Sequence, residues 1–192
     1  ALHACEAYVE LLHKEGLIEV KTAINDLMRL VIQNSELEEQ ERPLMEVNLN
    51  QVFVGNPGTG KTTVATLYAK ILLHLGLLSK GELIFKTPSD FVGSVLGSSE
   101  QQTRSILESA QGCVLVIDEA YGLNPCKGTG NSSRDPYNEA VVDTLVAQIQ
   151  GVPGEDRAVL LLGYQKEMED LFAKANPGLA RRFQADSPFV FA

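Results

Sequence analysis

Cysteine and histidine are scarce in this chain, and the few that are present form no recognisable pattern. The 192 residues include three cysteines and three histidines. The cysteines are odd in number and scattered, at Cys5, Cys113 and Cys126. This spacing argues against a disulfide framework and predicts a reducing compartment. No histidine lies at zinc-ligand spacing from them. We therefore expect a cytoplasmic protein without structural zinc, and the nucleus stays open as an alternative.

Positive charge and long apolar runs are also in short supply. The chain has 16 basic residues against 25 acidic ones, a net charge of −9. This balance disfavours nonspecific binding to nucleic acid or anionic lipid, which needs a basic surface. The longest apolar run, residues 158–163, is far too short to span a membrane. We expect neither nucleic acid nor a membrane as a partner. The sequence has no secretory signal and starts without methionine, so we expect a piece of a longer protein.

One glycine-rich stretch, residues 55–62 (GNPGTGKT), organises the rest of the chain. It matches the phosphate-binding pattern G-x-x-x-x-G-K-[ST] at every fixed position. A strand-like apolar run precedes it and a helical pattern follows it, which is the context that the motif requires. Glycines at Gly55, Gly58 and Gly60 tolerate positive φ and leave room for phosphate against inward-facing N–H groups. The N-terminus of the following helix adds partial positive charge. The stretch predicts a triphosphate site.

Individual roles follow from the chemistry of a nucleoside triphosphate. Lys61 is expected to neutralise the β- and γ-phosphates, and Thr62 to offer its hydroxyl to Mg²⁺. The residues expected to contact the nucleotide are Asn56, Pro57, Gly58, Thr59, Gly60, Lys61, Thr62 and Thr63.

A pair of carboxylates follows a second buried strand. Residues 113–117 form a continuous apolar run, typical of a parallel strand that is buried on both faces. Asp118 and Glu119 come directly after it. We expect Asp118 to bind Mg²⁺, directly or through water, and Glu119 to polarise the water that attacks the γ-phosphate. Glu119 therefore predicts hydrolysis rather than binding alone.

Apolar patterns along the chain alternate between helical and strand-like. Helices are predicted at residues 1–14, 19–39 and 137–150, and strands at residues 49–54, 82–86, 113–117, 158–162 and 189–191. Thr87 is expected to cap a helix that has Pro88 in its first position. Ser98 with Gln101 resembles a capping box for the next helix. A polar loop is expected at residues 122–136. The alternation implies a parallel sheet with helices on both faces.

The sheet also predicts where a ligand would bind. Ligands of such sheets lie outside the carboxyl ends of the strands, which places Gly60, Asp118 and Tyr164 along one edge. We assign residues 1–45 to an N-terminal helical segment and residues 46–192 to an α/β nucleotide-binding core.

The turn between the first two helices offers a candidate edge for the adenine base. Gly16, Leu17 and Ile18 form this turn, and the N-terminal helices are expected to pack beside the nucleotide. Plain helix packing is the alternative.

Several segments together resemble an AAA+ ATPase, and within it the CbxX/CfqX family, the group of red-type Rubisco activase and proteins similar to stage V sporulation protein K. The segments that carry the resemblance are residues 56–65 (NPGTGKTTVA), 116–121 (VIDEAY), 163–164 (GY), 176–179 (NPGL) and 181–183 (RRF). It extends over residues 17–187, nearly the whole chain.

The resemblance implies ATP hydrolysis, a five-stranded parallel sheet in the order 5-1-4-3-2 and a homo-oligomeric ring, usually a hexamer. It implies that Arg182 reaches the γ-phosphate of a neighbouring subunit as an arginine finger, with Arg181 as a second candidate for this contact. A surface arginine pair is the alternative. Tyr164 occupies a sensor position that usually holds a small polar residue.

The chain departs from the family in two places. The pore loop, residues 91–97, lacks the aromatic residue expected near Val95, so Phe91 or Leu96 would have to replace it, and Phe91 fits the core better. The helical lid after the fifth strand is absent, so we expect the chain alone to be monomeric or weakly active.

Two functions remain open on these grounds. One is an ATP-driven motor that remodels a protein client, which the sequence does not identify. The other is a nucleotide-dependent assembly scaffold that hydrolyses slowly and does not thread a polypeptide.

Overall fold

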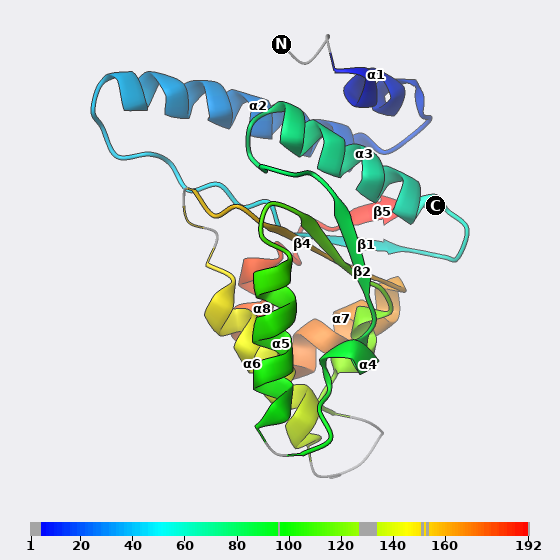
Figure 1. Ribbon diagram of the computed structural model, residues 1–192. Coiled ribbons are helices and arrows are strands. Elements are labelled where there is room, and N and C mark those ends of the chain that lie inside the picture. The colour runs from blue at the N-terminus through cyan, green and yellow to red at the C-terminus, as the bar shows by residue number, and fades with distance from the viewer. Residues whose placement is uncertain (1–4, 96, 127–133, 151, 153, 192) are drawn as a thin grey trace.

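A five-stranded parallel sheet runs through the middle of the chain (Figure 1). The computed structural model describes every residue except 1–4, 96, 127–133, 151, 153 and 192. The strands lie in the order β2-β3-β4-β1-β5, which is the expected order read from the opposite edge. Their bounds are β1 Gln51–Gly55, β2 Leu83–Lys86, β3 Val114–Ile117, β4 Ala158–Gly163 and β5 Phe189–Phe191.

The apolar strands are buried on both faces of the sheet, as their sequences predicted. Every residue of β3 and β4 is buried. Within β1 the side chains alternate, because successive residues of a strand point to opposite faces. Phe53 therefore belongs to one apolar core, and Val52 and Val54 belong to the other. The sheet separates these two cores.

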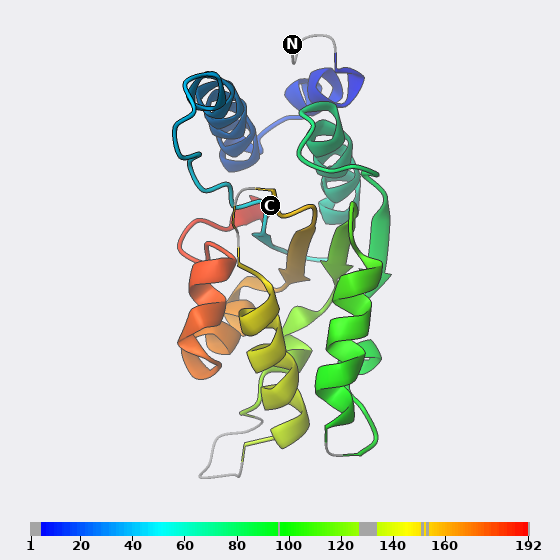
Figure 2. The same cartoon turned by 60° about the vertical axis from the view of Figure 1, so that its left-hand side comes forward.

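Helices cover both faces of the sheet in two layers (Figures 1 and 2). The layer over the Phe53 face comprises α1 Glu6–His13, α2 Ile18–Glu39 and α3 Lys61–His74. The layer over the other face comprises α4 Pro88–Phe91, α5 Ser98–Ser109, the 3₁₀ helix η2 Ala120–Leu123, α6 Pro136–Gln148, α7 Gln165–Lys174 and α8 Pro177–Arg182. None of the described helices combines the length and the apolar character that crossing a bilayer requires.

The N-terminal helices share the first core with the sheet. Leu11 of α1 and Ile24 of α2 are fully buried in the same cluster as Phe53. The division into an N-terminal helical segment, residues 1–45, and a nucleotide-binding core, residues 46–192, stays a prediction. Of the first predicted helix, residues 1–4 lie outside the described residues, as does part of the predicted polar loop.

One predicted helix cap is confirmed and the other is wrong. The N–H of Thr87 donates to Asp90 Oδ2 at 2.7 Å, and the backbone hydrogen bond holds the pKa of that carboxyl below its usual range. Helix α5 instead begins after Gly97, whose φ of 85° ends the preceding loop. The Ser98 hydroxyl turns back to Val95 and donates to its carbonyl at 2.6 Å. Ser98 is thus a loop clamp rather than a capping box.

Two of the three loop glycines adopt the backbone conformation that the sequence predicted, and the third does not. Gly58 and Gly60 have φ values of 76° and 88°. Gly55 does not have a positive φ. Its lack of a side chain instead allows the neighbouring strand to pack closely against it. A Cβ on Gly55 would lie 2.8 Å from Cβ of Phe191 on the neighbouring strand β5.

Replacing Gly55 with alanine is expected to destabilise the fold. The added methyl group meets strand β5, and overpacking of this kind costs about 1–3 kcal/mol. Gly76→Ala is the matched control, since Gly76 has φ 74° but open space around its Cβ position, and it should cost only about 1 kcal/mol. Urea denaturation followed by circular dichroism measures both. Equal stability of the Gly55→Ala and wild-type chains would contradict the close approach of β5.

Candidate functional site

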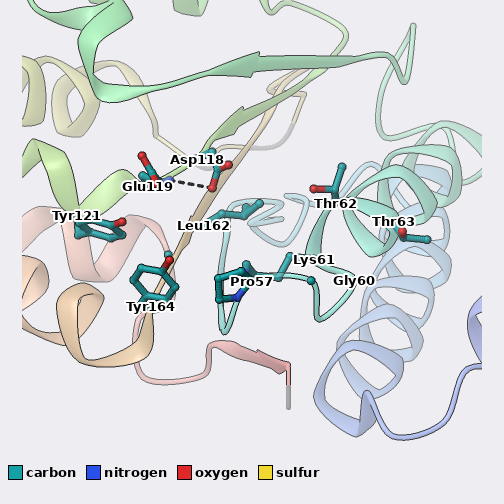
Figure 3. A pocket seen from close by; sticks show the side chains of 12 residues that line it. Pro57, Gly60, Lys61, Thr62, Thr63, Asp118, Glu119, Tyr121, Leu162 and Tyr164 are labelled. Atoms are coloured by element: carbon teal, nitrogen blue, oxygen red, sulfur yellow. Dashed lines mark hydrogen bonds between the residues drawn. The ribbon is translucent and has the colours of Figure 1, made fainter.

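A cavity of about 480 Å³ opens at the carboxyl ends of β1, β3 and β4 (Figure 3). It brings together Gly60, Asp118 and Tyr164, which the sheet argument placed along one edge. Its lining residues are Pro57, Gly58, Gly60, Lys61, Thr62, Thr63, Asp118, Glu119, Tyr121, Leu162, Gly163 and Tyr164.

The glycine-rich loop forms one wall of the cavity, between β1 and α3. Gly60 is the N-cap of α3, and its left-handed backbone turns the chain into the helix. Apart from the adjacent residues, no atom lies within 4 Å of the position that a Cβ would take on Gly58 or Gly60. The first N–H groups of α3 have no partner inside the helix. The loop is therefore an open cradle of the kind that fits a phosphate group.

Lys61 spans the loop with its ammonium group. Its Nζ donates to the carbonyl oxygens of Gly55 and Asn56, each at 2.8 Å. Partial burial lowers the pKa of Lys61, and the nearby carboxylate of Asp118 partly opposes this. The ammonium group is held inside the loop by two backbone carbonyls.

Asp118 and Glu119 face this loop from the end of β3. Asp118 Oδ1 accepts the N–H of Glu119 at 2.9 Å (Figure 3). Glu119 adopts φ 51° and ψ 40°, a left-handed backbone that non-glycine residues rarely adopt. Both side chains are exposed to the cavity, and so is Thr62.

The oxygen ligands at this site suit magnesium better than a transition metal. A carboxylate and a hydroxyl, Asp118 and Thr62, line the cavity together. Mg²⁺ usually takes one or two carboxylates and completes its shell with water and substrate phosphates. Among the described residues, no group of three or more His, Cys, Asp or Glu side chains could hold a metal ion.

Sequence reasoning missed Tyr121 as a residue of the site. Its ring stacks on that of Tyr164, with centroids 5.6 Å apart and an interplanar angle of 23°. Burial raises the pKa of Tyr121, and the carboxylate of Glu119 adds to the rise. The available signal was its place two residues after Glu119. Gly163, which precedes Tyr164, leaves the space that the ring of Tyr121 needs.

The three residues proposed for the adenine edge line two different hollows, Gly16 and Leu17 in one and Ile18 in the other. Leu17 lines a hollow of about 310 Å³ together with Thr59, Gly60 and Phe191, next to the phosphate loop. Ile18 lines a separate hollow and is 72% exposed. The structure brings Leu17 to the loop, and it does not bring Ile18 there.

Arg181 and Arg182 lie at the end of α8 and do not line the cavity. Asn176 caps this helix by accepting the N–H of Gly178 at 2.9 Å. Arg182 Nε donates to the carbonyl oxygen of Ile149 at 3.1 Å, and Arg181 is exposed.

The pore-loop residues also separate clearly. Phe91 is fully buried, as its core assignment predicted, so its ring is not available to a partner. Val95 is 62% exposed. Leu96 lies outside the described residues.

Comparison with known proteins shows the family of the chain. The family model "ATPase family associated with various cellular activities (AAA)" matches residues 51–187. Stage V sporulation protein K of Bacillus subtilis is 36% identical over 91% of this chain and 52% of its own length. A protein CfxQ homolog of Galdieria sulphuraria is 38% identical, over 87% and 52%.

A third relative is the chloroplastic ribulose bisphosphate carboxylase/oxygenase activase of Cyanidioschyzon merolae. It is 37% identical over 87% of this chain and 55% of its own length. The chain therefore spans about half the length of these curated relatives. On the family match over most of its length, the chain belongs to the AAA family of ATPases, among relatives of the CbxX/CfxQ group.

Proposed function

We propose that this AAA module binds ATP with Mg²⁺ and hydrolyses it to ADP and phosphate. One observation carries the proposal: a single cavity collects Lys61 and Thr62 from the start of α3 and Asp118 and Glu119 from the segment directly after β3. Cationic and N–H donors on one wall fit a polyphosphate, and carboxylates on the other fit its metal and its nucleophile.

Each residue has a distinct part in this proposal. Lys61 leaves the two carbonyl oxygens it now contacts and binds the β- and γ-phosphates. Thr62 and Asp118 hold Mg²⁺, which supplies charge neutralisation when it is bound. Glu119 takes a proton from water, whose oxygen bonds to the γ-phosphorus as the bond to the β-phosphate oxygen breaks. The nucleotide contacts assigned to the loop are Asn56, Pro57, Gly58, Thr59, Gly60, Lys61, Thr62 and Thr63.

We further propose that copies of the protein assemble into a hexameric ring and that this ring remodels a protein client. Arg181 and Arg182 lie outside the cavity of their own chain, which suits residues that act on a neighbour. A cation delivered by the next subunit would stabilise the charge that develops on the γ-phosphate. Hydrolysis would then depend on assembly.

Mixing two inactive variants tests this arrangement. In the protein expressed from its complete reading frame, Arg182→Ala and Glu119→Gln should each lower phosphate release, the arginine change by about 10³-fold or more. In a mixed ring, an intact arginine meets an intact Glu119, so activity should recover at least about tenfold over either variant alone.

Controls for the mixing experiment come from the same helix. Arg181→Ala tested in the same way decides which arginine acts in trans. Urea denaturation checks the Arg182→Ala fold, because this side chain also contacts Ile149. If the variants assemble together, as seen by light scattering, and phosphate release stays at the level of either alone, the trans role is wrong.

A nucleotide-dependent scaffold is the second candidate, and the pore loop favours it. Phe91 is buried and the exposed Val95 is aliphatic, so the described part of this loop offers no aromatic grip. Addition of casein, an unstructured polypeptide, discriminates the two functions. Faster phosphate release in its presence favours the motor, and unchanged slow turnover with tight ATP binding favours the scaffold.

A further inference from the structure

Glu119, the second residue of the carboxylate pair, begins a turn and has an unusual backbone conformation. Its left-handed φ of 51° and ψ of 40° place it at the start of η2. A residue with a Cβ enters this region only at an energetic cost, so neighbouring groups must hold it there. The direction of the Glu119 side chain depends on that backbone.

Hydrogen bonds fix the side of the turn that faces the protein interior. Glu119 accepts the N–H of Gly122 at 2.9 Å through its carbonyl oxygen, and Tyr121 accepts the N–H of Asn124 at 3.0 Å. The side-chain amide of Asn138 on α6 donates to the Gly122 carbonyl oxygen at 3.1 Å. These contacts hold the turn from behind.

On the cavity side, the turn is held by an aromatic ring. Tyr121 stacks on Tyr164 at the end of β4, and both rings lie on the side of the cavity opposite Thr62 (Figure 3). The contact needs a glycine beside it, because a Cβ on Gly163 would lie 2.9 Å from Cδ1 of Tyr121. The stack therefore ties the Glu119 turn to the strand next to β3.

The stacking of the ring, rather than its hydroxyl group, is the working part of Tyr121. None of the other described residues that line the cavity forms a hydrogen bond with this hydroxyl (Figure 3). Burial, and after it the nearby carboxylates of Glu119 and Glu167, raise the pKa of Tyr121 above its usual value, so the hydroxyl stays protonated. A phenylalanine ring would keep the stacked geometry.

We propose that Tyr121 is a positioning residue, which stacks on Tyr164 and thereby holds the left-handed turn that orients Glu119 towards the cavity. The proposal rests on the hydrolysis of ATP proposed above, in which Glu119 acts on water. In this proposal Tyr121 contacts neither the attacking water nor the γ-phosphate. It acts through the backbone of the turn.

Amide hydrogen exchange tests the turn without any nucleotide. In Tyr121→Ala, the Gly122 and Asn124 amides should exchange about tenfold faster, since the stacked pair no longer closes the turn. Tyr121→Phe should keep the wild-type protection. Tyr137→Ala, which removes a partly exposed tyrosine outside the cavity, should leave both amides unchanged.

Kinetics then test the effect on Glu119. Tyr121→Ala should lower kcat on the order of a hundredfold, because a displaced catalytic group loses its alignment, while the Kd for ATP stays within about twofold of wild type. Tyr121→Phe should restore kcat. In a Glu119→Gln background, removal of the Tyr121 ring should have little further effect on kcat.

Unchanged exchange of the Gly122 amide in Tyr121→Ala overturns the inference, whatever the activity of the protein. A Tyr121→Phe variant that behaves like Tyr121→Ala also overturns it, since the hydroxyl would then be the working group. If the wild-type chain binds ATP but does not hydrolyse it, the proposed hydrolysis fails separately, and the exchange result still decides whether the stack holds the turn.

Discussion

Lys61→Ala is expected to raise the Kd for ATP about a hundredfold or more. Among the described residues that line the cavity, Lys61 is the one lysine. Each hydrogen bond from its charged ammonium group to a phosphate would contribute about 1.5–3 kcal/mol to binding. Titration calorimetry with ATP and Mg²⁺ measures the change. The fold should persist, because Lys61 is only partly buried and its two present partners belong to the loop itself.

The matched control for Lys61 lies on the same helix. Lys70 is an exposed lysine of α3, nine residues further along, and does not line the cavity. Lys70→Ala removes the same charge from the chain and should leave ATP affinity unchanged. If the two variants weaken binding equally, the loop is not the phosphate site and the proposed ATPase has no basis here.

Glu119→Gln is expected to stop turnover while ATP still binds. Glutamine keeps the size of the side chain and removes the group that accepts a proton, and loss of a general base lowers kcat by about 10²–10⁴-fold. Phosphate release under saturating ATP gives kcat, and calorimetry gives the Kd, which should stay near that of wild type. The variant would therefore hold ATP in its uncleaved form.

Glu167→Gln is the control for a carboxylate near this site. Glu167 is exposed on α7 and close enough to raise the pKa of Tyr121, but it does not line the cavity. Its replacement should leave kcat unchanged. Normal phosphate release by Glu119→Gln would show that another group activates the water, and the role given to Glu119 would be wrong.

Local sequence patterns predicted most of the fold. Continuous apolar runs located β3 and β4 because strands buried on both faces need apolar side chains on each. The glycine-rich loop and the carboxylates after β3 were also readable, since each lies within a few consecutive residues. The strand order came from the family resemblance, because periodicity does not specify which strands are neighbours.

Features that depend on contacts between distant segments could not be predicted. The Tyr121–Tyr164 stack joins residues 43 positions apart and exists only because β3 and β4 are adjacent. Gly55 looked like a flexible loop glycine, yet its role depends on β5, far along the chain. The prediction that Ser98 caps α5 was wrong because Gly97, with its left-handed backbone, takes the N-cap position and Ser98 is already the first residue of the helix.

The separation of the interior into two cores has a mechanical consequence for the molecule. The phosphate loop leads into α3, which packs in one core, whereas the turn after Asp118 packs in the other. A ligand that touched Lys61 and Asp118 at once would brace the two halves against each other across the rim of the sheet. Binding and release of such a ligand would then change how firmly both helical layers are held against the sheet, rather than the position of a single loop.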